Sequence, residues 1–158
     1  MPQRTAQQWF DAYGQSHQNK TNKFIHWIMV PLIFFTIVAL LWELPKPQWM
    51  GENPFINWAS LIMLPVLYFY YTLSLSIMLG MFAFTCCCLL ASYVLDLHLP
   101  ISLWSFSLGM FAIAWVFQFI GHKIEGAKPS FFEDLQFLLV GPAWLLGFIY
   151  QRLGIRYD

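Results

Sequence analysis

Four histidines are the side chains of this chain best suited to chemistry. His17 and His26 flank the start of a long apolar run, and His122 follows Gly121 where another apolar run ends. Neutral imidazole is a common ligand for iron, zinc, copper and nickel. If His17, His26 and His122 meet, they form a metal site. If they stay apart, each hydrogen-bonds a helix end or a lipid headgroup.

The spacing of the first two histidines sets a condition on such a site. His17 and His26 are nine residues apart, which is about 900° of rotation on one helix and places them on opposite faces. They can share a ligand only if the chain bends between them. We predict that bend at Asn19–Asn22.

The fourth histidine, His98, lies 24 residues before His122. If all of these residues are helical, the two imidazoles are ~36 Å apart. His98 can then join the others only if the segment from Pro100 to Ser107 folds back and the next span begins near Leu108. Asp96, two residues earlier, would support His98 from behind as a hydrogen-bond partner.

Several polar residues accompany the histidines. Lys123, Glu125 and Lys128 follow His122 and either form a solvated loop or, in the case of the lysines, hold an acidic lipid headgroup. Asn22, next to the predicted bend, is either a turn or cap residue or a ligand.

Other chemistries are excluded by the motifs that the sequence lacks. There is no HxxxH or HxxHH box of the kind that membrane desaturases use, and no GxSxG, glycine-rich phosphate loop or CxxC. The consecutive cysteines Cys86–Cys88 point about 100° apart on a helix, so they cannot jointly chelate one ion.

The composition identifies the kind of molecule that must position these residues. The 158 residues are 59% hydrophobic and only 10% charged, whereas soluble domains carry roughly 25% charged residues. We therefore predict a single integral membrane domain over residues 1–158, in a bacterial inner membrane or in the endoplasmic reticulum. The net charge is zero and no basic block is present, so no nucleic-acid partner is expected.

The uncharged runs predict an all-α, polytopic helical bundle with about four spanning helices. A span needs ~20 apolar residues, and the 39 uncharged residues from Asn57 to Leu95 are long enough for two, with a turn near Tyr71–Ser76. The predicted elements are an amphipathic interfacial helix over Thr5–Tyr13, spans over Phe24–Trp42, within Asn57–Leu95 and over Pro100–Ile120, and a last segment over Leu135–Tyr150.

The positive charges favour a C-terminal segment that does not cross. If the last segment turns back at Gly141-Pro142, seven lysines and arginines lie on one side and one on the other. If it spans, the division is five to three. The positive-inside rule favours the first arrangement, a re-entrant segment, over a fifth span.

The histidine motifs resemble those of the membrane Fe(II)-dependent 2-hydroxy fatty acid dioxygenases. The yeast member of that family acts in fatty-acid α-oxidation during phytosphingosine breakdown. An aspartate and a histidine before the last full span also look like the family, although here one residue separates Asp96 from His98. The residues that carry the resemblance are Tyr13, His17, Asn22, His26, Pro31, the segment WVFQFIGH ending at His122, Glu125, Pro129, Gly141 and Pro142.

The resemblance implies iron bound by histidines, O2 as co-substrate and cleavage between C1 and C2 of a 2-hydroxy fatty acid. On this basis we predict metal ligands at His17, His26, His98 and His122, with His17, His26 and His122 as the catalytic set. The predicted substrate-binding residues are Asn22, Lys123, Glu125 and Lys128.

The predicted layout suits this chemistry, because the polar head of the substrate can reach an interfacial metal while its tail lies among helices in the bilayer. Two alternatives stay open: a non-catalytic membrane protein whose histidines bind lipid headgroups, and a zinc-dependent membrane hydrolase with Glu125 as base. The sequence indicates neither the chain length of the substrate nor the oligomeric state.

Overall fold

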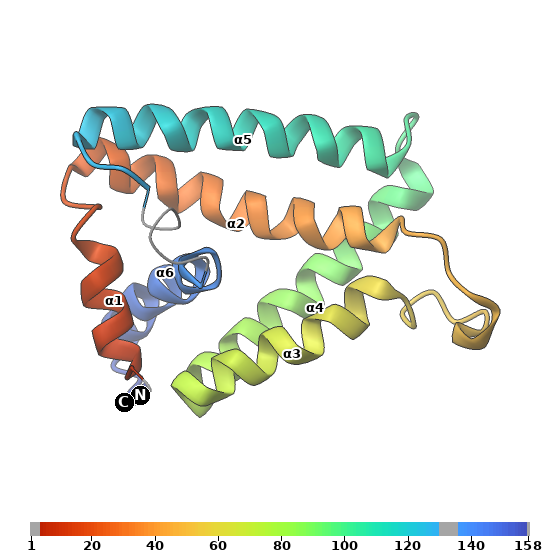
Figure 1. The fold of residues 1–158 in the computed structure, drawn as a ribbon. Helices are drawn as coiled ribbons and strands as arrows, with labels where there is room; N and C mark the ends of the chain where they lie inside the picture. Colours follow the sequence, from red (N-terminus) through yellow and green to blue (C-terminus); the bar gives the residue numbers. More distant parts are fainter. Residues whose placement is uncertain (1–3, 130–135, 158) are drawn as a thin grey trace.

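The computed structural model describes residues 4–129 and 136–157, and every secondary-structure element in these ranges is a helix (Figure 1). The all-α prediction is confirmed, and the long uncharged region divides into two helices at Ser74. Leu135, the predicted start of the last segment, lies outside the described residues. The elements are α1 (Ala6–Gly14), α2 (Lys20–Trp42), the 3-10 helix η1 (Gln48–Met50), α3 (Trp58–Leu73), α4 (Leu75–His98), α5 (Leu103–Glu125) and α6 (Phe137–Leu153).

Helices α2 and α5 form an antiparallel pair along their lengths (Figure 1), which brings the beginning of α2 beside the end of α5. Asn19 begins α2, because its side chain accepts hydrogen bonds from the backbone N–H groups of Thr21 and Asn22. Ser102 caps α5 in the same way, and Gly126 ends it in the left-handed conformation that glycine adopts without strain.

Among the described residues, three helices are long and apolar enough to cross a membrane, namely α2, α4 and α5. Their 23 or 24 residues rise by ~35 Å, more than the ~30 Å of a bilayer core. Helix α3 pairs with α4 but has only 16 residues, or ~24 Å, so it accounts for the difference from the four predicted spans.

Helix α6 is the most enclosed element of the described chain. It continues through Pro142 and does not turn back at Gly141-Pro142, contrary to the arrangement that the positive charges favour. The residues from Val140 to Leu145 are buried, and α6 packs against α1, α2 and α4. Neighbouring helices therefore support the backbone where the proline removes a hydrogen bond.

The predicted amphipathic N-terminal helix is confirmed as α1. Thr5 caps it in a capping box, and its apolar side is buried against α6. The ring of Trp9 lies 5.2 Å from that of Phe137, and the ring of Tyr13 lies 5.2 Å from that of Trp144. These contacts fix the end of α1, and with it the loop that carries His17.

Candidate metal centre

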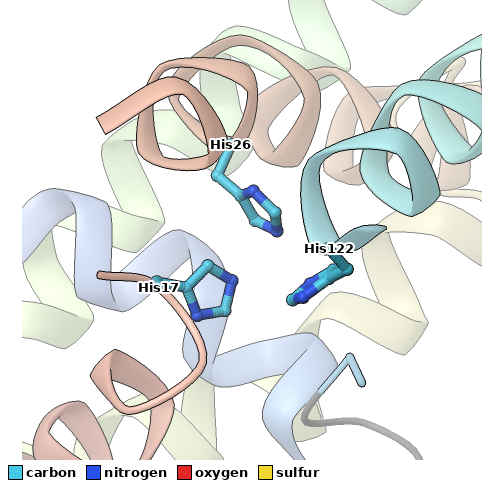
Figure 2. Close-up of side chains that lie close together, drawn as sticks. All are labelled: His17, His26 and His122. Carbon is cyan, nitrogen blue, oxygen red and sulfur yellow. The ribbon is translucent and has the colours of Figure 1, made fainter. Parts of the chain in front are cut away.

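Three histidines from three different elements meet at one end of the α2–α5 pair. His17 lies in the loop after α1, His26 in the second turn of α2 and His122 in the last turn of α5. Figure 2 shows their rings gathered around one point, and one nitrogen from each ring lies within 4.8 Å of the others. All three side chains are buried, with exposed fractions of 0%, 1% and 6%.

Backbone carbonyls fix the protonation of two of these rings. The Nδ1–H of His17 donates to the carbonyl of Tyr13 over 2.7 Å, and that of His26 donates to the carbonyl of Asn22 over 2.9 Å. A carbonyl can only accept, so each Nδ1 carries the proton and each Nε2 keeps a free lone pair. Hydrogen bonds of this kind orient the histidines that bind metals.

The remaining nitrogens meet the requirement for a metal ion. His17 Nε2 and His122 Nδ1 are buried and have no hydrogen-bond partner among the described residues. Buried nitrogens without partners are costly in a folded protein, and a cation between them would use their lone pairs. Burial also lowers the pKa of His17 to about 4, so its imidazole is neutral at pH 7 and ready to bind a cation.

Glu125 holds the bend between His17 and His26. Its Oε1 accepts from the N–H of Gln18 over 2.7 Å, and its Oε2 accepts from the N–H of Asn19 over 2.8 Å and from Nδ2 of Asn22 over 3.0 Å. The loop that carries His17 is thereby fixed to the end of α5. Sequence reasoning predicts Glu125 and Asn22 as substrate-binding residues, whereas in the structure the carboxylate of Glu125 and Nδ2 of Asn22 hold the loop that carries His17.

Gly121 permits the close contact of α2 and α5 at this point. A Cβ atom at Gly121 would collide with Oδ1 of Asn22, whose side chain is fully buried between the helices. Any larger residue would displace the side chain of Asn22 and disturb its hydrogen bond to Glu125.

His98 does not join the other three, which corrects the predicted four-histidine site. It is exposed at the end of α4, and its Nδ1 lies 2.8 Å from the carbonyl of Val94. The predicted fold-back over Pro100–Ser107 is absent, because α5 begins at Leu103 and runs straight to the other end of the molecule. His122 is therefore ~29 Å along α5 from its start.

The predicted partner of His98 also has a different contact. The Nε1–H of Trp42, at the end of α2 distant from the histidine cluster, donates a hydrogen bond to Oδ2 of Asp96 over 3.4 Å.

His98→Ala is therefore expected to leave metal binding by the three clustered histidines within about twofold of the wild type, as for other exposed substitutions. Metal analysis of the purified variant measures this binding. A loss of bound metal would return His98 to the site.

The other predicted substrate residues, Lys123 and Lys128, are exposed, and neither lines the apolar cavity beside the histidines or a second cavity that touches His17. Lys23, which sequence reasoning missed, does line one. Its position three residues before His26 on a helix is the only signal that the sequence holds for it.

An apolar cavity of about 340 Å³ begins at the histidines and extends between α2, α3, α5 and α6. His26 and His122 lie at one end of it. Ile37, Ile62 and Leu138 lie on its lining and are 38%, 38% and 42% exposed, so the cavity reaches the surface beside these residues. Its remaining lining residues are Tyr13, Val30, Ile33, Phe34, Leu41, Met63, Val66, Phe111, Trp115, Gln118, Pro129, Phe137, Leu139, Gly141 and Pro142.

A second cavity, of about 300 Å³, touches the cluster at His17. Its lining is mixed: Gln18 and Lys23 contribute to it, and so do the aromatic side chains of Phe10, Trp144 and Phe148.

Comparison with known proteins places this chain in a family. A family profile described as 2-hydroxy-palmitic acid dioxygenase Mpo1-like matches residues 3–153. The chain belongs to this family. The Mpo1-like match includes all four histidines and Glu125, and it confirms the family that the histidine motifs resemble.

One relative of this Mpo1-like chain is the 2-hydroxy-palmitic acid dioxygenase MPO1 of Saccharomyces cerevisiae. The two are 28% identical over 144 residues, which make up 90% of this chain and 78% of the yeast protein. No solved structure matches the chain.

Proposed function

We propose that this protein is an Fe(II)-dependent dioxygenase that cleaves the C1–C2 bond of 2-hydroxy fatty acids within a membrane. One observation carries the proposal: three buried imidazoles, two with unpartnered nitrogens, face one another at the end of an apolar cavity. The family description and the name of the yeast relative support the substrate class, because both specify 2-hydroxy-palmitic acid.

His17, His26 and His122 would hold the iron, which when bound supplies the redox chemistry with O2 that no protein side chain provides. The chain's own contribution is positional. The carbonyls of Tyr13 and Asn22 orient two of the rings, and Glu125 fixes the loop between them. A ligand set held from behind in this way keeps its geometry when a substrate enters.

The apolar cavity would hold the alkyl tail. Its volume lies within the range of ~300–1,000 Å³ typical of small-molecule sites. Each buried methylene contributes about 0.8 kcal/mol, so a long chain binds more tightly than a short one. The cavity ends at the histidines, so the head of the substrate, with the C1–C2 bond, would lie at the metal.

The proposed reaction balances without a second organic substrate. A 2-hydroxy acid and O2 give a fatty acid shorter by one carbon, CO2 and water. The C1–C2 bond breaks, C1 leaves as CO2 and C2 is oxidised from an alcohol to a carboxyl group. All electrons that reduce O2 come from the substrate, so 2-oxoglutarate is not required.

The test is reconstitution of the purified, metal-free protein with Fe(II) under anaerobic conditions, followed by addition of 2-hydroxy-palmitic acid and O2. We expect pentadecanoic acid and CO2, with one O2 consumed for each product molecule. Palmitic acid, which lacks the 2-hydroxyl, is the matched control and should not react. No turnover at full iron content would overturn the proposal.

Two observations disfavour the alternatives. A zinc hydrolase would need Glu125 as a base, but both oxygens of Glu125 accept hydrogen bonds from the chain itself. A protein that only binds headgroups would need exposed histidines, but the three at this site are buried. Turnover with zinc and without O2 would nevertheless support the hydrolase.

A further inference from the structure

Two uncharged polar side chains, those of Gln118 and Tyr13, lie in the lining of the apolar cavity. The side-chain amide of Gln118 and the phenol oxygen of Tyr13 do not hold the histidine rings. Gln118 is 5% exposed and Tyr13 is 7% exposed. Each stands four residues before a histidine, Gln118 before His122 and Tyr13 before His17. This spacing places Gln118 one helical turn from His122.

Both side chains lack a hydrogen-bond partner in the part of the chain that the structure describes. Neither the amide of Gln118 nor the phenol oxygen of Tyr13 makes a hydrogen bond within residues 4–129 and 136–157. Buried polar groups are normally paired, so an unpaired amide and an unpaired hydroxyl beside one cavity point to a ligand with complementary groups. Tyr13 is also held in place, since its ring stacks on that of His17 at 4.1 Å between centroids.

We propose that Gln118 and Tyr13 bind the polar head of the substrate, and that Gln118 selects the 2-hydroxy acid over the plain fatty acid. This inference rests on the proposed function. A hydroxyl both donates and accepts, and the amide of Gln118, one helical turn from His122, can offer it an acceptor oxygen and N–H donors at the same time. A carboxylate only accepts, which suits the hydroxyl donor of Tyr13.

This division of roles predicts how each residue affects selectivity. Palmitic acid in the same cavity would leave the amide of Gln118 buried and unpaired. A site built to bind a hydroxyl rejects the analogue without that hydroxyl for this reason. The carboxylate is common to both acids, so Tyr13 contributes equally to each. Removal of the amide should therefore abolish the preference, whereas removal of the phenol oxygen should weaken both acids alike.

The experiment measures equilibrium binding of labelled 2-hydroxy-palmitic acid and palmitic acid to the metal-free protein in phosphatidylcholine nanodiscs. In the wild type, the hydroxy acid should bind about tenfold more tightly. Gln118→Leu should bring the ratio of the two dissociation constants close to one, through weaker binding of the hydroxy acid. Tyr13→Phe should weaken both acids and leave the ratio unchanged.

Matched controls are Gln48→Leu and Tyr68→Phe, whose side chains are exposed and do not line either cavity. Both should behave as the wild type. If Gln118→Leu does not give a monodisperse protein, Gln118→Met, which keeps nearly the same volume, replaces it.

A tenfold preference that survives loss of the amide would overturn the inference, as would a wild type that does not distinguish the two acids. Because the protein in this assay carries no metal, the result is independent of catalysis. An inactive protein in which Gln118 still sets the preference would contradict the proposed reaction alone, and an active enzyme with an unchanged ratio would contradict the inference alone.

Discussion

Replacement of His17, His26 or His122 by alanine is expected to abolish turnover and to lower bound iron to a small fraction of the wild-type content, with the protein still in the membrane. Each ring offers one nitrogen to the common point, so each loss removes one of three ligand atoms. Insertion depends on the apolar surface of α2, α4 and α5, which these substitutions do not change. Iron per chain after anaerobic reconstitution, together with O2 uptake, measures both effects.

His98→Ala is the matched control, because it removes an imidazole from the other end of the molecule. Normal iron content and turnover in any one of the three cluster variants would show that the residue in question is not a ligand.

Loss of the Glu125 carboxylate is expected to have the next largest effect. Glu125→Ala removes the acceptors of three hydrogen bonds and frees the loop that carries His17. Substitution of a residue that positions metal ligands through hydrogen bonds typically lowers metal affinity by ~10–100-fold, so we expect Glu125→Ala to lower iron affinity by this amount. Glu125→Gln keeps one acceptor oxygen, which can still serve Asn19 and Asn22, and should bind iron with intermediate affinity. Metal titration of both variants and the wild type measures the three iron affinities.

A different pattern would show that Glu125 acts as a base. In that case glutamine and alanine would be equally inactive, because neither accepts a proton, and both variants would bind the metal as tightly as the wild type. The comparison of the two substitutions therefore separates the positioning role from the hydrolase alternative.

The helical layout could be predicted because uncharged runs such as Phe24–Trp42 must form their backbone hydrogen bonds internally. The same property conceals which helices are enclosed. Helix α6 is apolar on all sides, and a side chain that faces lipid has the same character as one that faces protein. Its buried position therefore could not be predicted from Phe137–Leu153 alone.

The need for a bend between His17 and His26 could be predicted, since nine residues of one continuous helix would place them on opposite faces. The structure places His17 in the loop before α2, and Asn19 caps the helix that carries His26. His98 shows the limit of a resemblance, which transfers residue types but not their positions. Ser102 caps α5, so the helix begins at Leu103 and not near Leu108, and it is long enough for a full span. His98, which precedes this start, therefore lies at the far end of α5 from His122. The contacts of Gln118 likewise depend on helices distant in the sequence.

The apolar cavity reaches the surface beside Ile37 and Ile62, and this position determines whether the substrate concentration in the membrane or in water would set the rate. An opening in the side of a bundle that crosses a membrane faces acyl chains, so a hydrophobic molecule could enter by lateral diffusion and never pass through water. The rate would then follow the mole fraction of 2-hydroxy acid among the lipids. Dilution with inert phospholipid would slow the reaction even when the total amount of substrate per volume is unchanged.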